Sequence, residues 1–178
     1  EFVESIYGNL VKFSKNQIEA LKENNWTWGT KGLADWVAPV NSENDEADPN
    51  TSEGAEICGT GFVYKMLESM IYISEVLGIK DNIEIFKNAR ENIYKAFNEK
   101  FFNKEKNVYE TLFWEQRGKR EKYRQTSNLI PLAFGLVPEE QKNIVFSNLV
   151  DDIKCKGYHL DTGCIGTKFI LPVLLENE

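Results

Sequence analysis

The feature that most constrains how this chain folds is a regular alternation of long and short connections between helical segments. Apolar side chains recur at helical intervals in six segments of the sequence. The predicted helices cover about residues 2–23, 60–77, 81–101, 125–134 and 139–154, with a sixth after Thr162. Two connections are short, around Gly78 and Gly135, and three are long, over 24–59, 102–124 and 155–162.

This alternation predicts where a functional site should lie. In an up-and-down array of helices, successive connections lie at opposite ends of the array. The three long connections should therefore share one end, which we call the rim, and the two short turns should share the other. Because loops longer than about 12 residues are usually functional or disordered, we expect the rim to carry the functional site.

The helices also alternate in their expected burial. The segments 60–77, 125–134 and the one after Thr162 are apolar around most of their circumference. In contrast, 81–101 and 139–154 each have one apolar face and one charged face. The sequence therefore indicates an all-α fold of about six helices in antiparallel, up-and-down hairpins.

Length and charge limit the classes of protein to consider. A chain of 178 residues and 20.5 kDa predicts a single segment over 1–178. The 21 basic and 28 acidic residues give a net charge of −7, which argues against nucleic acid or an anionic membrane surface as a partner. No apolar run approaches the roughly 20 residues that span a bilayer. Because the chain begins inside an amphipathic helix, we expect it to be part of a longer protein.

The three cysteines, Cys58, Cys155 and Cys164, have no CxxC spacing. Their odd number leaves at least one thiol over in any disulfide scheme, so we expect reduced and mostly buried thiols. This favours a reducing compartment, and we expect a cytoplasmic location. Cys164 precedes an apolar helix and could be an activated thiol, but a structural cysteine is the favoured interpretation.

The first long connection holds the aromatic candidates for ligand binding. Trp26, Trp28 and Trp36 lie within eleven residues, and Asp35 lies beside Trp36. An indole face can stack on the C–H groups of a sugar while a carboxylate accepts hydrogen bonds from its hydroxyls. The same tryptophans could equally pack the loop onto the helices, and spacing alone does not decide between the two.

His159, in the third long connection, is the only histidine of the chain. This excludes a metal site with several histidines and any catalytic dyad built on another histidine. His159 and Thr162 precede the sixth predicted helix, whose N-terminal amides can bind a hydroxyl or a carboxylate. A histidine that only bonds the backbone is an equally good interpretation.

Acidic residues in the long connections give two further candidates. The range 108–114 is the one weakly predicted strand of the chain. Glu110 lies within this range, and Glu115 follows it directly. They are candidates because a glycosidase needs two opposed carboxyl groups. Exposed charges of a hairpin are the favoured interpretation of this pair. The acidic stretch 41–56 lacks the alternating spacing and central glycine of an EF-hand, so we expect a solvated loop rather than a calcium site.

Seven short motifs of this chain occur in the same order in the catalytic domain of bacterial α-L-rhamnosidases, which the chain resembles over essentially its whole length. They are Trp28-Gly29 with Gly32-Leu33-Ala34-Asp35-Trp36 and Pro39, Thr60-Gly61-Phe62, Leu77-Gly78, Ala96-Phe97-Asn98 with Phe101, Gln125-Thr126, Phe134 to Glu140, and His159 to Thr167. The resemblance implies a partial (α/α)6 barrel, in which inner helices are ringed by outer ones.

The resemblance also implies a function. Enzymes of that family cleave terminal α-L-rhamnosyl residues with inversion, using one glutamate as acid and a second to activate water. The stretches that carry both glutamates are absent here, so no catalytic residue is expected, and neither a metal nor a cofactor. The chain would supply the substrate-lining residues Asp35, Trp36, Trp28, His159 and Thr162 for a rhamnose-containing glycoside. Alone, it should be inactive and could form a homo-oligomer through its exposed inner face.

Two alternatives remain open at this point. Another (α/α)6 glycosidase, of the glucoamylase or trehalase kind, would share the helix pattern. A helical-repeat binding scaffold is suggested by a tetratricopeptide-like pattern around Phe86 and Ala89. That pattern does not recur 34 residues later, where Arg120 and Tyr123 replace them.

Overall fold

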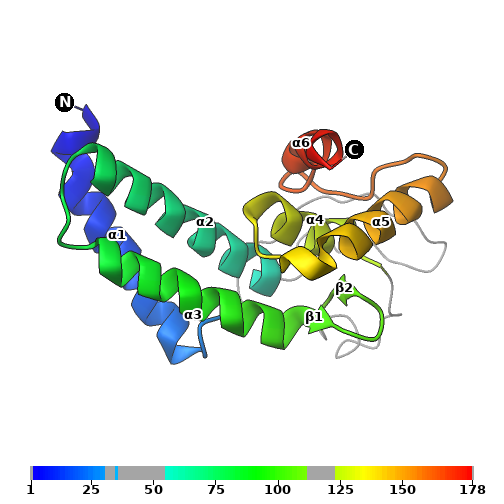
Figure 1. Ribbon diagram of the computed structural model, residues 1–178, viewed down its shortest axis with the longest axis horizontal. Coiled ribbons are helices and arrows are strands. Elements are labelled where there is room, and N and C mark those ends of the chain that lie inside the picture. The colour runs from blue at the N-terminus through cyan, green and yellow to red at the C-terminus, as the bar shows by residue number, and fades with distance from the viewer. Residues whose placement is uncertain (1, 31–34, 36–54, 112–122, 178) are drawn as a thin grey trace.

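The computed structural model describes residues 2–30, 35, 55–111 and 123–177 (Figure 1). These residues form six α-helices and one short pair of strands. The elements are α1 (Phe2–Glu23), α2 (Ala55–Val76), α3 (Ile83–Phe101), β1 (Phe102–Asn103), β2 (Val108–Tyr109), α4 (Gln125–Phe134), α5 (Glu139–Cys155) and α6 (Thr167–Glu176). The all-α class expected from the sequence is therefore confirmed.

The helices lie in two rows. Helix α2 contacts α4, and α4 contacts α6, so these three form an inner row. Helices α1 and α3 pack on α2, and α5 packs on α4, as the outer row (Figure 1). Nine of the ten residues of α4 are buried, whereas only one face of α3 or α5 is. The expected alternation is confirmed for α3, α4 and α5, whereas α6 was expected to be buried and has only two buried residues.

Helix α2 begins at Ala55, five residues before the expected start at Thr60. The expectation was wrong because 55–59 belong to the helix and not to the first long connection. Gly59 and Gly61 both lie inside the helix, where they allow close packing. A Cβ atom on Gly59 would lie 2.5 Å from the ring of Trp28, and one on Gly61 would lie 2.6 Å from Ile130. Glycine is therefore required there by contacts with distant residues rather than by a turn.

The two short turns confirm the sequence analysis. Gly78 follows α2 with φ +70°, and Gly135 ends α4 with φ +68°. The left-handed region is the conformation that favours glycine at the end of a helix. In α4, the amide of Gly135 donates to the carbonyl of Leu132, and that of Leu136 donates to the carbonyl of Pro131. These local bonds stop the helix without help from the rest of the chain.

Strands β1 and β2 form an antiparallel hairpin in which Phe102 pairs with Tyr109 and Asn103 with Val108. The strand predicted over 108–114 is thus confirmed at Val108 and Tyr109. Glu110 and Thr111 are not part of a strand, and the predicted part beyond Thr111 lies outside the described residues. The hairpin continues directly from α3 and lies in the second long connection.

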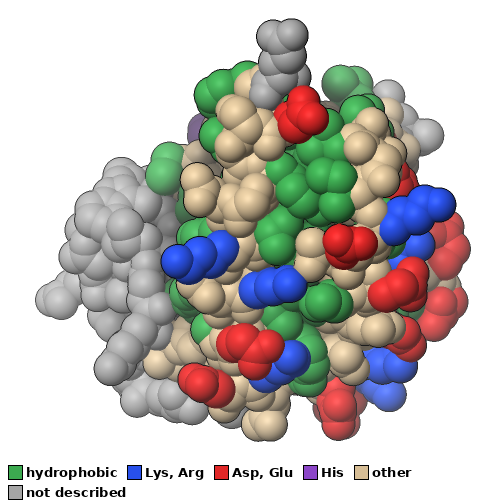
Figure 2. Space-filling view, turned by 90° about the vertical axis from the view of Figure 1, so that its left-hand side faces the viewer, with side chains coloured by type: hydrophobic (Ala, Val, Ile, Leu, Met, Phe, Trp, Pro, Cys, Tyr) green, Lys and Arg blue, Asp and Glu red, His purple; other side chains and the backbone are tan. Residues whose placement is uncertain are grey.

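Apolar side chains also remain on the surface. On α6, only Ile170 and Val173 are buried, whereas Leu171 and Leu175 are 66% and 71% exposed. Figure 2 shows the end of the molecule with the α2–α3 turn, where hydrophobic side chains form an interrupted band between charged ones. Tyr72, near the end of α2, is among the exposed large hydrophobic residues. Among the described helices, none combines the length and the apolar character that crossing a membrane requires.

Candidate functional site

The three long connections meet at one end of the helix array. Asp35, from the first connection, bonds to Thr126 at the start of α4 and to the turn before α6. The β-hairpin of the second connection bonds to α4 through Tyr109 and Asn128. The rim predicted from loop lengths is therefore present in the described residues, and it is formed around the first turns of α2, α4 and α6.

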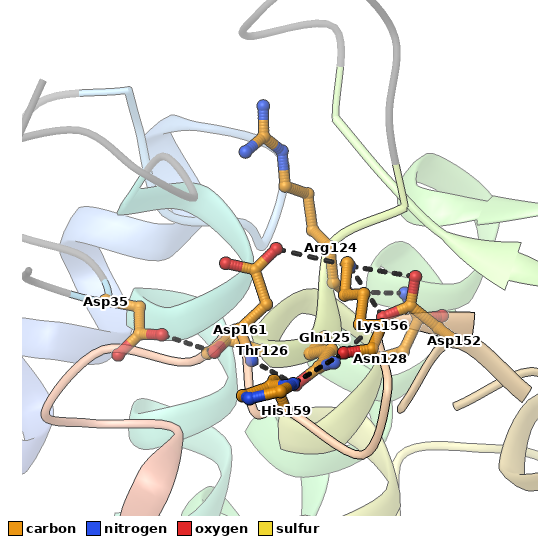
Figure 3. Close-up of polar contacts among 9 residues, drawn as sticks. All are labelled: Asp35, Arg124, Gln125, Thr126, Asn128, Asp152, Lys156, His159 and Asp161. Carbon is orange, nitrogen blue, oxygen red and sulfur yellow. Dashed lines mark hydrogen bonds and ion pairs between the residues drawn. The ribbon is translucent and has the colours of Figure 1, made fainter. Parts of the chain in front are cut away.

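The carboxylate of Asp35 lies at the centre of the rim. Asp35 is 1% exposed, and one of its oxygens accepts hydrogen bonds from the Thr126 hydroxyl and the Gly163 amide. The other oxygen accepts from the amides of Ile165 and Gly166, each at 3.0 Å. Figure 3 shows the bond between Asp35 and Thr126. Amides at the N-terminal end of a helix stabilise an anion through their partial positive charge. Asp35 thus ties the first connection to both α4 and α6.

The turn before α6 leaves no room for a larger residue at position 166. A Cβ atom on Gly166 would lie 2.2 Å from the Thr126 hydroxyl and 3.0 Å from Cβ of Thr162. Thr162 is buried, and its hydroxyl shares a 2.8 Å hydrogen bond with that of Thr167. The Thr162 side chain therefore forms part of the wall that packs the α6 turn against α4.

The third connection is held to α4 through Gln125. The side-chain amide of Gln125 donates to Asp152 at 2.8 Å, and its oxygen accepts from the Asp161 backbone amide at 2.7 Å. Lys156 forms ion pairs with both carboxylates, at 2.7 Å to Asp152 and 3.2 Å to Asp161 (Figure 3). Because Asp161 is buried, this pairing offsets the cost of removing its charge from water.

The second connection is held to α4 through Asn128. The Asn128 side chain accepts from the Tyr109 amide at 2.7 Å and donates to the Tyr109 carbonyl at 3.1 Å. It thus bonds both polar groups of one strand residue, as a neighbouring strand would. The Tyr109 hydroxyl in turn donates to Asn98 at 2.5 Å. Burial raises the pKa of Tyr109 well above its ordinary value, and the nearby phenol of Tyr94 adds to the shift.

Trp28 is packed rather than free in solution. Its ring lies against Gly59, and its backbone amide donates to the Thr60 hydroxyl at 2.8 Å. Its neighbour Thr27 accepts a hydrogen bond from Lys100, which also pairs with Glu56 at 2.7 Å. The side chain of Trp28 remains half-buried, so one part of the indole packs on α2 while another part reaches the surface.

His159 is exposed at the rim. Its Nδ1 lies 2.8 Å from the Lys156 carbonyl oxygen. Because a carbonyl oxygen only accepts, Nδ1 must carry the proton in this contact, which leaves Nε2 as the acceptor of the neutral ring. Figure 3 shows His159 in front of the Gln125 and Asp161 side chains. The structure thus contains the backbone contact that the sequence analysis considered, together with a ring that solvent can reach.

The structure places four of the five predicted substrate-lining residues. Asp35 and Thr162 are buried at the α6 turn, whereas Trp28 and His159 reach the surface. Trp36 lies outside the described residues. Their grouping at one end of the helix array agrees with the prediction, but the carboxylate of Asp35 is already occupied by four donors of the chain itself.

The structure describes some of the acidic candidates and all three cysteines. Glu110 accepts from Asn103 at 2.6 Å and pairs with Lys106 at 3.3 Å beside the hairpin, as expected for hairpin charges. Glu115 and almost all of the acidic stretch lie outside the described residues. Within the described ranges, no cluster of three or more His, Cys, Asp or Glu could hold a metal. No disulfide forms, but the expectation of mostly buried thiols was wrong, because two of the three cysteines are exposed.

The sequence analysis missed the importance of the first turn of α4. Gln125, Thr126 and Asn128 are each at most 1% exposed, and each bonds a different long connection. A signal for them exists in the sequence, since 125–128 is a polar run at the start of an otherwise apolar helix. Polar residues at the buried end of an inner helix need partners, and here the loops and α5 supply them.

A pocket of about 230 Å³ lies beside this turn. Its walls come from the β-hairpin and from the residues that lead into α4. They are Lys106, Val108, Tyr109, Glu110, Tyr123, Arg124 and Asn128. The rim thus contains a recess with both aromatic and charged side chains.

Comparison with known proteins identifies relatives of the whole chain. Residues 1–178 match the model of the bacterial α-L-rhamnosidase six-hairpin glycosidase domain. An α-L-rhamnosidase of Formosa agariphila is 32% identical over 146 residues, which are 81% of this chain and 14% of that protein. One of Alteromonas sp. strain LOR is 25% identical over 144 residues, which are 81% of this chain and 15% of that protein. The chain therefore spans about a seventh of the length of these curated relatives.

Solved structures agree in fold. The α-L-rhamnosidase of Dictyoglumus thermophilum superimposes with a TM-score of 0.79 at 24% identity, covering 98% of this chain and 18% of that one. The Streptomyces avermitilis α-L-rhamnosidase, solved in complex with L-rhamnose, gives 0.67 at 19% identity, covering 96% and 15%. At these identities the likeness shows the fold alone, and it places the described helices in a six-hairpin array.

Proposed function

The chain belongs to the family of bacterial α-L-rhamnosidase six-hairpin glycosidase domains, and on this premise we propose that it forms the sugar-binding rim of such an enzyme. The longer parent protein would cleave terminal α-L-rhamnosyl residues from a glycoside with inversion. The observation that carries this proposal is the meeting of three long connections at the first turns of α2, α4 and α6. Such a rim offers backbone, aromatic and imidazole groups to one ligand.

The rim residues would have different roles. The indoles of Trp28 and Trp36 would stack on the sugar, and Nε2 of His159 would accept a hydrogen bond from a sugar hydroxyl. Asp35 and Thr162 would shape the turn that faces the sugar, since both are buried and bonded within the chain. The acid and the base of an inverting reaction would come from parts of the parent outside this chain.

Sugar binding can be tested by titrating the chain with L-rhamnose while its tryptophan fluorescence is recorded. We expect saturable quenching that is lost in Trp36→Ala and weakened in His159→Ala. Trp26→Phe is a matched control from the same connection, because Trp26 packs against the core beside Lys22. No saturable response at high sugar concentration, in the chain or in its parent, would refute the sugar-binding rim.

Catalysis can be tested on the parent protein with an aryl α-L-rhamnoside. We expect hydrolysis in which proton NMR detects β-L-rhamnose first, because an inverting enzyme releases the opposite anomer. The 178-residue chain alone should release no aryl group. Release by the chain alone would contradict the assignment of the acid and the base to other parts of the parent.

We also propose that the isolated chain associates with a second copy through its inner row of helices. The exposed side chains of Leu171 and Leu175 on α6 support this, because water-exposed apolar side chains are stabilised by burial. Light scattering should give the mass of a dimer or larger species, and Leu171→Lys combined with Leu175→Glu should give a monomer. A monomeric mass for the unmodified chain would contradict this proposal.

A further inference from the structure

The first turn of α4 contacts every long connection of the rim, and each contact uses a different side chain. Gln125 bonds the third connection at Asp161, and Thr126 bonds the first at Asp35. Asn128 bonds the second at Tyr109. Three side chains in four consecutive residues of one helix thus bond three segments that are far apart in the sequence.

We infer that Gln125, Thr126 and Asn128 are positioning residues, which hold the three rim loops in their sugar-binding arrangement. This inference rests on the proposed function, since it assigns a role in the same site. None of the three side chains is expected to touch sugar, because each is buried and occupied by its partner loop. They would act on binding only through the loops that they hold.

The burial of this turn explains why each of its polar side chains is bonded to a particular partner. In the first turn of α4, the backbone carbonyls of Gln125, Thr126 and Asn128 are bonded to amides one turn later in the helix, so the buried side chains of these residues must find partners elsewhere. A loop that leaves its partner on α4 exposes or leaves unsatisfied a buried donor or acceptor, which is costly. A loop that moves away from α4 therefore loses its own bond but leaves the other two intact.

Close packing strengthens the first of these contacts. The Thr126 hydroxyl donates to Asp35 and also lies where a Cβ atom on residue 166 would be. Asp35 simultaneously accepts from the amides of Gly163, Ile165 and Gly166. Thr126 therefore fixes the first connection and the α6 turn together, and its loss should affect both.

Hydrogen exchange of the 178-residue chain, read by mass spectrometry, tests the separate contacts. Three near-isosteric variants each remove the side-chain bonds from α4 to one loop, and Gln125→Met also removes the bond to Asp152 on α5. We expect Thr126→Val to speed hydrogen exchange of the amides at 163–166. Asn128→Leu should speed exchange of the amides at 108–110, and Gln125→Met should speed exchange of those at 159–161. Each local increase should be about tenfold or more, because each variant removes at least one buried hydrogen bond to its loop.

Two controls separate positioning from general loss of stability. Thr126→Ser keeps the hydroxyl and should restore slow exchange at 163–166. Ser74→Ala removes an equally buried hydroxyl, which bonds to Tyr7 and Met70 at the other end of α2. This variant should leave the exchange rates of all three groups of rim amides unchanged. Equal increases in exchange rate over the whole chain, or no increase in any of the three groups of amides, would overturn the inference.

Kinetics of the parent protein supply the functional measurement. Loosened loops spend less time in the binding arrangement, so KM for an aryl α-L-rhamnoside should rise about tenfold in each variant while kcat changes less than about twofold. Faster exchange of the rim amides without a rise in KM, or a loss confined to kcat, would refute the positioning role. If the unmodified parent cleaves no rhamnoside, the proposed function fails instead, and exchange alone decides whether α4 holds the loops.

Discussion

The two ends of the helix array are built in different ways. At the short-turn end, Gly78 and Gly135 stop their helices through a left-handed backbone and local hydrogen bonds. At the rim, the loops are held by buried side chains whose partners are far away in the sequence. The bond from Gly166 to Asp35 spans 131 positions, and that from Thr126 to Asp35 spans 91.

This difference indicates how far the effect of a substitution should spread at each end. A turn that is made by one glycine depends on a few neighbouring residues, so its changes should have small and local effects. A rim that is made by shared polar partners depends on several segments at once. Changes there should cost more and should spread between segments.

The largest expected effect comes from Asp35→Ala, which removes the acceptor shared by four donors. We expect a loss of about 3–5 kcal/mol in the free energy of unfolding, because the donors are buried and left without this partner. Urea denaturation followed by circular dichroism measures it. The control Asp151→Ala removes an exposed carboxylate on α5 and should change stability by less than about 0.5 kcal/mol. Equal losses in both would show that the four donors bonded to Asp35 do not make this carboxylate more important than an exposed one.

Gly166→Ala should lower the free energy of unfolding by about 2 kcal/mol, because the new methyl group meets the Thr126 hydroxyl. Adding Thr126→Ala to this variant should recover part of the loss, which a double-mutant cycle detects. Gly8→Ala on α1 is the matched control, since nothing lies within 4 Å of its Cβ position, and it should stabilise the helix. Strict additivity of the two changes would show that residues 126 and 166 are not coupled.

The buried phenol of Tyr109 should make stability fall at alkaline pH. Burial raises its pKa in the folded chain, so above about pH 10 the unfolded chain releases this proton while the folded chain keeps it. The contribution is complete below the unfolded pKa and declines above it, by at most about 1.4 kcal/mol per pH unit. Unfolding free energies of the wild type and Tyr109→Phe across this range measure it. Identical slopes for both proteins would refute this assignment.

Gly135→Ala at the short-turn end should have the smallest effect, about 1 kcal/mol. Its Cβ position is open, so only the left-handed backbone conformation opposes the substitution. Thermal unfolding should show a modest drop, and hydrogen exchange at the rim should be unchanged. Faster exchange at 163–166 in this variant would show that the two ends are coupled, contrary to the comparison drawn above.

Much of the fold could be predicted from the sequence because its signals are local. Helical periodicity and the glycines at 78 and 135 depend on neighbouring residues, so the helices, the short turns and the shared rim were all predictable. The start of α2 was missed because Gly59 packs on Trp28, a contact that no local pattern records. Helix α6 also begins later than expected, at Thr167, since Asp35 holds the turn before it.

The site was less predictable for the same reason. Asp35 and Trp28 were recognised as candidates by residue type, but their partners on α2, α4 and α6 come from other parts of the chain. Gln125 and Asn128 were missed as site residues because a polar residue at a helix start has many ordinary explanations. Only the structure shows that each is buried and bonds a different loop.

A crystal structure of the parent protein with bound L-rhamnose tests the central claim most directly. We predict that the sugar lies at the rim, with an indole of the first connection against its ring and His159 within hydrogen-bond distance of a hydroxyl. Gln125, Thr126 and Asn128 should keep their bonds to the three loops beneath it. A sugar bound at the end that carries Gly78 and Gly135, or outside the helix array, would contradict the account.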